Sequence, residues 1–376
     1  MWELLTLEAF EELHAVFAHK FGHSPAYISH WDPLDDEACA IAKQLHVPPT
    51  IDPVRYLYPN DGDGPSMVQS CLGYPTSRKV IITPSSTSST VVTLTLAARL
   101  GIRRIILVQP FYFATLRVVE ILDLQPRLWP AQRGSNGFWL EPLDQHSIGP
   151  ETAVWITDPL YCTGHSLLDR SREVLDDCLE QGALIILDQS LSNPTVSETA
   201  GSLVDHDRCW VVGSPHKGIC VNGVKFSYLS VPVDLVDIGR HFSDVLCGGA
   251  SSSNVLAVEQ FVRGDVSRAW HAILPLLTQR KAWLSSQVDQ CDAIEIDTAT
   301  SGHFVSCYFQ GLSADREQSE RLVADVLDKT GMLVIPGNRA YFAETLGFNF
   351  RVNLLRLDSG AEGRLHHALE YLSCRR

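Results

Sequence analysis

The chain has 376 residues, of which 45% are hydrophobic and 20% are charged, and its formal net charge is −14. This composition is typical of a globular protein with one large domain and one smaller domain, and it excludes a disordered, collagen-like or low-complexity chain. The acidic charge also argues against a nucleic-acid-binding body, because phosphate backbones require a basic face on the protein.

Signals for membranes, secretion and metal binding are weak. No stretch approaches the roughly 18 uninterrupted apolar residues of a membrane-spanning helix. Residues 1–5 lack the basic segment of a secretory signal, so we expect a cytoplasmic protein. The ten cysteines never occur at C-x-x-C spacing. Reduced, buried thiols are therefore expected, and structural zinc is not.

Short β-branched runs alternate with helical patterns through the first two thirds of the chain. Seven strands are predicted, over residues 79–83, 104–108, 126–129, 153–157, 183–187, 209–213 and 224–228. Helices are predicted over residues 85–100, from about residue 114, and over residues 171–181, where Gly182 supplies a usual helix end. Nearly continuous apolar strands between helices indicate an α/β fold with a mostly parallel sheet covered by helices on both faces.

The pattern changes from about residue 240. A Gly/Ser-rich loop over residues 247–254 precedes a long helical region over about residues 255–290. Beyond it come strands near 293–297 and 303–308, a helix over 314–331, strands over 333–335 and 350–355, and a terminal helix. This mixture predicts a smaller α+β domain at the C-terminus.

Polar residues follow the predicted strands at their carboxyl ends. They are residues 83–87, residues 109–112, residues 158–160, Asp188 and residues 214–217. In open α/β sheets, ligands bind beyond the carboxyl ends of the strands. We therefore expect these groups to meet along one edge of the sheet and to form the functional site.

Lys217 and Asp188 each allow an ordinary and a chemical interpretation. Most lysines in loops are solvated, and a carboxylate after a strand often caps a turn. A desolvated lysine in the turn Ser-x-x-Lys could instead form a Schiff base. A buried Asp188 could pair with a pyridinium nitrogen and keep that ring protonated as an electron sink.

Four further features could contribute to such a site, and three of them also have an ordinary interpretation. The hydroxyl-rich residues 83–88 join a strand to a helix, which makes either a phosphate site or a plain N-cap. Lys225 could add a cation to such a phosphate. Tyr112 could stack on a ring or belong to the core. Arg351 could bind a carboxylate through two parallel hydrogen bonds from its guanidinium, or it could form a surface ion pair.

In order and spacing, these motifs resemble the fold type I pyridoxal-phosphate enzymes of the aminotransferase class I/II family, over nearly the whole chain. The resemblance implies pyridoxal 5'-phosphate as the cofactor, an amino acid as the substrate and an α-keto acid as the acceptor. It also implies three regions. Residues 1–45 form an arm that packs with the small domain, residues 46–245 form the large cofactor-binding domain, and residues 246–376 form the small domain.

The resemblance also implies roles for individual residues. Lys217 would carry the Schiff base, Asp188 would pair with the pyridine nitrogen and Tyr112 would stack on the ring. Arg351 would bind the substrate's α-carboxylate, and Trp31 would stand where the substrate fits. The full set implied to hold the cofactor is Ser85, Ser86, Thr87, Tyr112, Asp158, Tyr161, Asp188, Ser214, Lys217, Lys225 and Tyr58.

Four positions depart from the family's pattern. Tyr161 replaces an asparagine and Leu191 replaces a tyrosine, both of which donate hydrogen bonds to the cofactor's phenolic oxygen. Trp31 replaces a glycine near the substrate, and Lys225 replaces the phosphate-binding arginine. Hydrogen bonds to the phenolic oxygen favour its charged, phenolate form. Losing their donors should therefore raise the pKa of the cofactor's Schiff base. Tyr161 could supply one of them.

The sequence therefore leaves three functions open. The first is amino-group transfer to an α-keto acid. The second is another reaction of a specialised amino acid on the same scaffold, namely elimination, cyclisation, decarboxylation or oxidation. The third is a non-catalytic regulatory domain, although the first 45 residues contain no basic recognition helix. The resemblance further implies a homodimer in which Tyr58 and the loop around Ser253 and Asn254 complete the partner's site.

Overall fold

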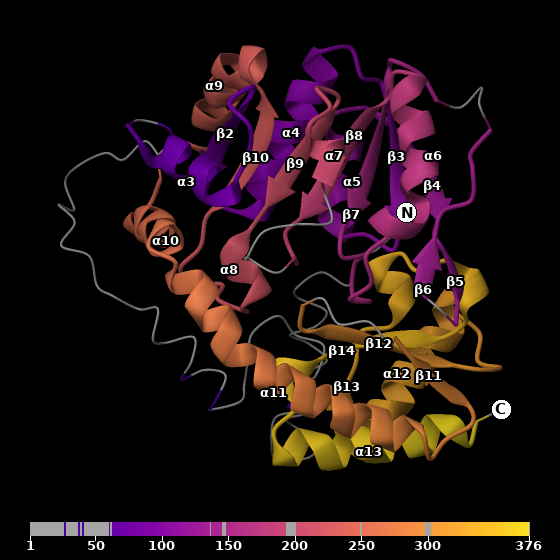
Figure 1. Ribbon diagram of the computed structural model, residues 1–376. Helices are drawn as coiled ribbons and strands as arrows, with labels where there is room; N and C mark the ends of the chain where they lie inside the picture. The colour runs from indigo at the N-terminus through magenta and orange to yellow at the C-terminus, as the bar shows by residue number, and fades with distance from the viewer. Residues whose placement is uncertain are drawn as a thin grey trace.

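A seven-stranded sheet forms the centre of the larger part of the molecule (Figure 1). The computed structural model describes residues 26–27, 37, 40, 60, 62–135, 137–144, 148–192, 201–248, 250–297 and 302–375. Trp31 and Tyr58 lie outside these described residues, as does most of the predicted arm.

The order of the strands confirms the predicted α/β class. From one edge to the other they are β2 (Arg78–Thr83), β10 (Ser227–Pro232), β9 (Cys209–Gly213), β8 (Leu184–Gln189), β7 (Thr152–Thr157), β3 (Arg104–Gln109) and β4 (Gln125–Pro130). All neighbours pair in parallel except β10, which is antiparallel to both β2 and β9. The sheet is therefore mostly parallel.

Helices cover both faces of this sheet, so its strands are apolar throughout. Trp155 of β7 enters one core, and its neighbours Val154 and Ile156 enter the other, because successive side chains point to opposite faces. The first core is closed by α4 (Ser86–Arg99), α5 (Phe113–Ile121) and α9 (Val236–Cys247). The second is closed by α3 (Gly64–Leu72), α6 (Leu168–Glu180) and α10 (Ser252–Val262).

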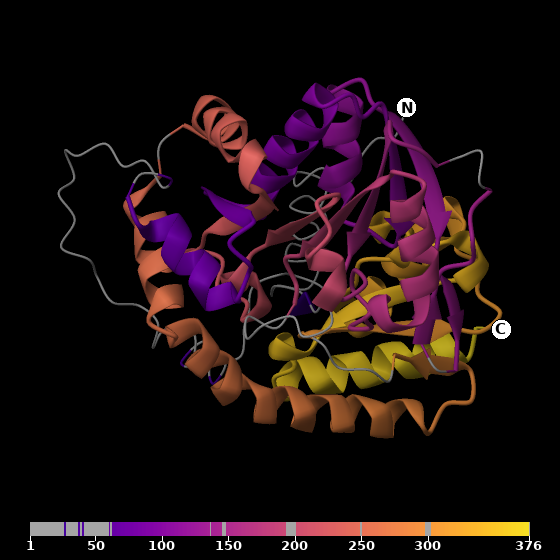
Figure 2. The same ribbon diagram turned by 45° about the horizontal axis from the view of Figure 1, so that its top comes forward.

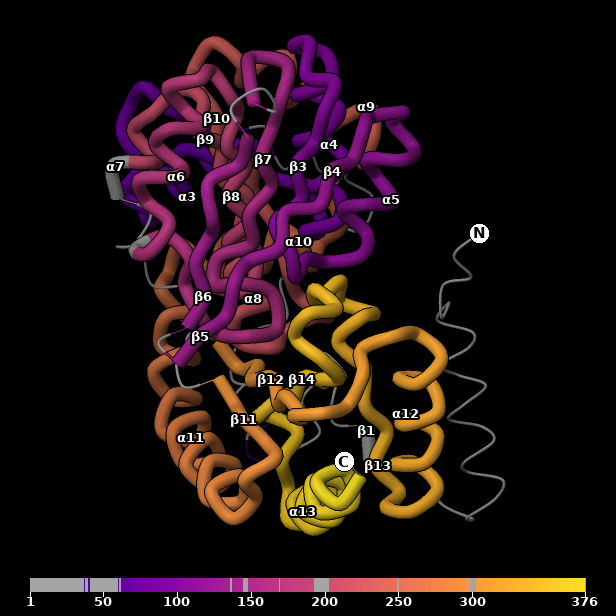
Figure 3. Tube along the Cα trace, turned by 90° about the vertical axis from the view of Figure 1, so that its right-hand side faces the viewer, coloured from indigo at the N-terminus to yellow at the C-terminus, as the bar shows by residue number. Residues whose placement is uncertain are grey.

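The smaller part is built on a three-stranded antiparallel sheet. Its strands are β11 (Ile294–Ile296), β12 (Phe304–Phe309) and β14 (Asn349–Asn353). The helices beside it are α11 (Asp265–Val288), α12 (Arg316–Thr330) and α13 (Ser359–Ser373). Figure 2 shows α11 leading from α10 along the small part, and Figure 3 shows the small sheet lying between the large sheet and α13.

Shorter elements complete the description. β1 (Ala26–Tyr27) pairs in parallel with β13 (Met332–Leu333), which joins a segment near the N-terminus to the smaller part. The others are β5 (Gln132–Gly134), β6 (Gly137–Trp139), α7 (Gly201–Val204), α8 (Pro215–Gly218), η2 (Val233–Leu235), η3 (Gly337–Ala340), η4 (Glu344–Leu346) and η5 (Leu354–Arg356). Among the described residues, no helix is long and apolar enough to cross a membrane.

Two of the differences from the predicted elements have a clear physical reason. The helical region over 255–290 is two helices, because Gly264 takes a φ of +77° between them, in the left-handed region that favours glycine. The last strand of the large sheet begins at Ser227, and Lys225 lies in the turn before it. The carbonyl of Lys225 accepts a hydrogen bond from Asn254 Nδ2 at 2.7 Å, so it is not used by a neighbouring strand.

Gly213 ends β9 and leads into the turn that carries Lys217. A Cβ atom at this position would lie 2.3 Å from Cζ of Tyr228. We expect Gly213→Ala to lower the free energy of unfolding by about 1–3 kcal/mol, because the buried ring must shift. Urea denaturation measures the change. Gly223→Ala is the matched control, since nothing lies within 4 Å of its built Cβ. Equal losses in the two variants would contradict the packing argument.

Candidate active site

Three strands bring the predicted site residues together at one edge of the large sheet. Lys217 lies on α8, which follows β9, and Asp188 lies near the end of the adjacent strand β8. Ser86 begins α4, which follows the edge strand β2. Lys217 Nζ donates a hydrogen bond to Ser86 Oγ at 2.7 Å. Residues distant in sequence thus meet, as the α/β topology predicts.

The surroundings of the Lys217 amine lower its pKa on balance. Its Nζ is 5.2 Å from the centre of the Tyr112 ring. Burial lowers the pKa of Lys217 to about 8, and the positive charges of Lys225 and Arg351 act in the same direction, whereas the carboxylate of Asp188 opposes them. A lysine with this pKa supplies a neutral, nucleophilic amine near physiological pH.

Asp188 is 7% exposed and accepts the backbone N–H of Ser190 at 3.0 Å. Burial raises the pKa of this carboxyl group, while the hydrogen bonds from Ser190 and the charge of Lys217 limit the rise. A buried carboxyl group at the end of a strand, next to a lysine turn, is suited to binding a cationic ring nitrogen.

The N-terminus of α4 offers backbone donors next to Lys217. Ser85 is the N-cap, and its Oγ accepts the N–H of Ser88 at 3.1 Å. Thr87 forms a side-chain hydrogen bond with the hydroxyl of Tyr112, whose pKa is raised by burial. The first N–H groups of a helix have no partner within the helix and carry partial positive charge. This end of α4 is therefore suited to binding a phosphate.

Asn254 joins two loops at this position. Its Nδ2 donates to the carbonyls of Pro84, at 3.1 Å, and Lys225, at 2.7 Å. Ser214, the residue before α8, shares a hydrogen bond with Ser227. Asn254, which the resemblance places near a partner subunit, lies in the first turn of α10 and uses its side-chain amide within its own chain. Its two hydrogen bonds place Lys225 beside the residue that precedes the N-cap of α4.

Arg351 approaches from the small sheet. It lies in β14, is 5% exposed, and its Nη1 donates to Tyr161 Oη at 2.9 Å and to Cys162 Sγ at 3.3 Å. Its guanidinium carbon is 4.9 Å from the centre of the Phe304 ring. The charge of Arg351 also contributes to the pKa of Lys217, so the predicted carboxylate-binding residue is close to the lysine.

Asp158 supports the loop that carries Tyr161. Its Oδ1 accepts the backbone N–H of Leu167 at 3.0 Å, and its own N–H donates to the carbonyl of Asp188 at 2.9 Å. Two predicted residues, Trp31 and Tyr58, are outside the described part of the chain. Several of the other predicted residues lie near Lys217 or at the N-terminus of α4, namely Ser85, Ser86, Thr87, Tyr112, Asp188, Ser214, Lys225 and Arg351. Tyr161 contacts Arg351.

Two neighbours of the site had no recognisable sequence signal. Phe304 lies against Arg351, and His303 precedes it at the start of β12. Burial, together with the charges of Arg351 and Lys217, lowers the pKa of His303 to about 3, so its imidazole is neutral. The apolar pattern predicted this strand, but only its pairing with β14 shows that it borders Arg351.

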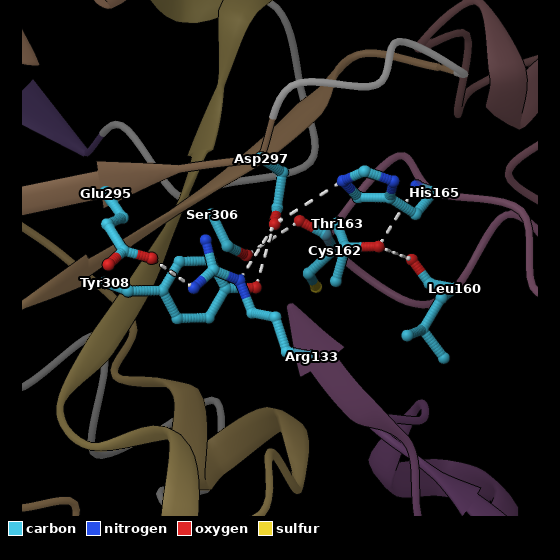
Figure 4. A network of polar contacts seen from close by, with 9 residues as sticks. All are labelled: Arg133, Leu160, Cys162, Thr163, His165, Glu295, Asp297, Ser306 and Tyr308. Carbon is cyan, nitrogen blue, oxygen red and sulfur yellow. Dashed lines mark hydrogen bonds and ion pairs between the residues drawn. The ribbon is translucent and has the colours of Figure 1, made fainter. Parts of the chain in front are cut away.

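A buried polar cluster joins the two parts of the molecule beside the Tyr161 loop (Figure 4). Asp297 lies 3.5 Å from Arg133 and 3.7 Å from His165, and it accepts the hydroxyl of Tyr308 at 3.0 Å. Arg133 also pairs with Glu295 at 2.7 Å. Arg133 and His165 belong to the larger part and Asp297 to the smaller part, so the cluster links the two.

Charges in this cluster are perturbed by burial. Burial raises the pKa of Asp297 to about 7, although Arg133 and Tyr308 act to lower it. Burial also lowers the pKa of His165 to about 4, so this histidine is neutral at pH 7. Near neutral pH the ion pair across the two parts therefore depends chiefly on the ionisation of Asp297.

Comparison with known proteins reveals similarity in structure alone. No protein-family model matches the chain, and no curated protein matches its sequence. N-succinyldiaminopimelate aminotransferase from Mycobacterium tuberculosis is similar in structure, with a TM-score of 0.73 and 18% identity, covering 98% of this chain and 97% of that one. The chain has the fold of the class I aminotransferases.

Other aminotransferases have the same likeness. A protein from Escherichia coli with a methionine aminotransferase function has a TM-score of 0.73 and 13% identity, covering 99% of both chains. Aspartate aminotransferase from Rhizobium meliloti has a TM-score of 0.73 and 13% identity, covering 98% of this chain and 96% of that one. This confirms the fold that the sequence resemblance implied.

The lowered pKa of Lys217 has a direct chemical consequence. In the protein without cofactor, acylation of Lys217 by a small reagent such as acetic anhydride should reach half its maximal rate near pH 8, where half of the amine is neutral. An ordinary lysine has its midpoint near pH 10.4. Mass spectrometry of the labelled peptide gives the profile. A midpoint at or above pH 10 would contradict the proposed surroundings of the amine.

The raised pKa of Asp297 predicts a pH-dependent stability. At pH values between the ordinary pKa of an aspartate and about 7, the folded protein holds a proton on Asp297 that the unfolded chain has released. This contribution to stability is therefore full at low pH and is lost as the pH rises toward and through 7.

Asp297→Asn removes this titration. The free energy of unfolding of wild type, relative to the Asp297→Asn variant, should fall between pH 4 and pH 7. Urea denaturation across this range gives the two curves. A constant or widening advantage of wild type would contradict the burial argument.

Proposed function

We propose that this chain is a pyridoxal-phosphate-dependent aminotransferase that moves an amino group from an amino acid to an α-keto acid. One observation carries this proposal. The amine of Lys217, with its lowered pKa, contacts Ser86 at the N-terminus of α4 and is close to the buried carboxyl group of Asp188. The aminotransferase fold supports the same conclusion, and the roles of the residues below are part of the proposal.

Pyridoxal 5'-phosphate suits the donors at this site. The N-terminus of α4, with Ser85, Ser86 and Thr87, would bind the phosphate, assisted by Ser214 and Lys225. Asp188 would hold the protonated ring nitrogen, and Tyr112 would cover the ring. When bound, this cofactor supplies an electron sink for the substrate's α-carbon.

The remaining chemistry belongs to side chains of this chain. Lys217 would bind the cofactor covalently. Once released, its neutral amine would take the proton from the substrate's α-carbon and would deliver it to the cofactor's C4′ carbon. Arg351 would fix the substrate's carboxylate and so orient the α-carbon. Desolvation lowers the pKa of Lys217 to about 8, which increases the fraction of neutral amine that both steps require.

We further propose the predicted domain boundaries and a cytoplasmic homodimer. The pairing of β1 with β13 supports an arm over residues 1–45 that packs with the small domain over 246–376, leaving residues 46–245 as the cofactor-binding domain. A homodimer in which Tyr58 completes the partner's phosphate site follows from the resemblance to the family.

A second candidate is a different reaction of an amino acid on this scaffold, without an α-keto acid. Leu191, which replaces a tyrosine of the family's pattern, is buried in the apolar core and can donate no hydrogen bond. The cofactor's phenolic oxygen would therefore lose one of its usual partners. This favours altered electronics at the ring, and with them a different product.

A panel of amino acids tested with and without an α-keto acid acceptor distinguishes these functions. Amino-group transfer to the acceptor supports the first, and product formed without acceptor, or with oxygen uptake, supports the second. Lys217→Ala should abolish either reaction, because it removes the amine that the proposal assigns to the covalent binding of the cofactor. The absence of both reactions and of any visible absorbance with the cofactor would refute the proposal.

Arg351→Lys should raise KM for the amino acid at least about tenfold, because a single ammonium replaces a bidentate fork. Steady-state kinetics measure the effect. Arg263→Lys is the matched control, since Arg263 is an exposed arginine paired with Glu259. Similar KM values for the two variants would contradict the role of Arg351.

A further inference from the structure

The hydroxyl of Tyr161 is committed to Arg351. Its oxygen accepts Nη1 of the guanidinium at 2.9 Å, and both side chains are almost entirely buried. The same Nη1 lies 3.3 Å from Cys162 Sγ, and the thiol and the phenol also share a hydrogen bond. One edge of the guanidinium is therefore held by two consecutive residues of a single loop.

That loop is attached to the strands on which Arg351 lies. Ser306 is the direct cross-strand neighbour of Arg351 between β12 and β14. Ser306 Oγ donates to the carbonyl of Cys162 at 2.9 Å, and His165 of the same loop lies 3.7 Å from Asp297 (Figure 4). Tyr161 and Arg351 thus come from the two parts of the molecule, yet their relative position is fixed.

The protonation state of Tyr161 suits this contact. Burial raises the pKa of the phenol well above its ordinary value, although the charge of Arg351 acts in the opposite direction. The group therefore remains a neutral hydroxyl at physiological pH, and its oxygen can accept from a cation. A guanidinium held in one orientation loses less freedom when a carboxylate binds, so binding is tighter.

We propose that Tyr161 is a positioning residue for Arg351, and that it makes the site select ligands with an α-carboxylate over the corresponding amines. This inference rests on the proposed function. It differs from a role for Tyr161 as hydrogen-bond donor to the cofactor's phenolic oxygen, which the sequence also allowed. The contact with Arg351 favours the positioning role.

A pair of probes measures this selectivity without turnover. 2-Methylalanine and tert-butylamine both lack a proton on the carbon that bears the amine, and they differ only in that a methyl group replaces the carboxylate. Their apparent dissociation constants follow from titrations of the visible spectrum of the protein loaded with pyridoxal 5'-phosphate. The dissociation constant of the amine divided by that of 2-methylalanine gives a ratio that isolates recognition of the carboxylate.

Tyr161→Phe should reduce this ratio about tenfold, the size of effect expected for one hydrogen bond to a charged group. The pH midpoint of the visible band without ligand should stay within about 0.3 units of the wild-type value. Tyr74→Phe is the matched control, because it removes a tyrosine hydroxyl that contacts Tyr228 instead of Arg351. Its ratio should equal that of wild type.

Ser306→Ala provides a second variant that leaves Tyr161 and Arg351 intact. Without the hydrogen bond to the carbonyl of Cys162, the loop is held less firmly, and the ratio should fall about threefold. This variant tests the inference even if Tyr161→Phe fails to fold.

Three results would overturn the inference. The first is a ratio within twofold of wild type for both Tyr161→Phe and Ser306→Ala. The second is a shift of the ligand-free midpoint by a unit or more in Tyr161→Phe at an unchanged ratio, which would assign the hydroxyl to the cofactor. The third is a wild-type protein with no visible band, or a band that survives Lys217→Ala. That last result would refute the proposed function itself and is thereby distinguishable from the other two.

Discussion

The contact between Lys217 and the N-terminus of α4 is the interaction on which the site depends. At this position burial and two neighbouring cations lower the pKa of the Lys217 amine. Asp188 limits the shift, so the pKa reaches about 8 and falls no lower. The lowered pKa of Lys217 therefore results from a balance of desolvation and charge, to which several distant segments contribute.

The architecture explains how those segments meet. β8 and β9 are adjacent and parallel, so their carboxyl ends place Asp188 and Lys217 at the same edge. Asn254 then ties the loop before α4 to the turn that carries Lys225. The small sheet adds Arg351, and the polar cluster around Asp297 fixes this sheet to the large part. Phosphate, ring and carboxylate would thus each be bound by a different layer of the fold.

Much of this arrangement could be predicted from the sequence, because buried parallel strands are almost continuously apolar and their ends are marked by polar motifs. The break at Gly264 could not, since the apolar residues on either side keep a helical spacing. The turn at Lys225 depends on Asn254 of α10, 29 residues further along the chain. The partnership of Tyr161 with Arg351 joins residues 190 positions apart, and no local pattern indicates it.

The central claim is that Lys217 is the covalent attachment point of the cofactor. Reduction of the protein with borohydride in the presence of pyridoxal 5'-phosphate would make any such attachment permanent, and peptide mass spectrometry would locate it. A single stoichiometric modification at Lys217 is the predicted result. Modification of other lysines with Lys217 left unmodified would contradict the account.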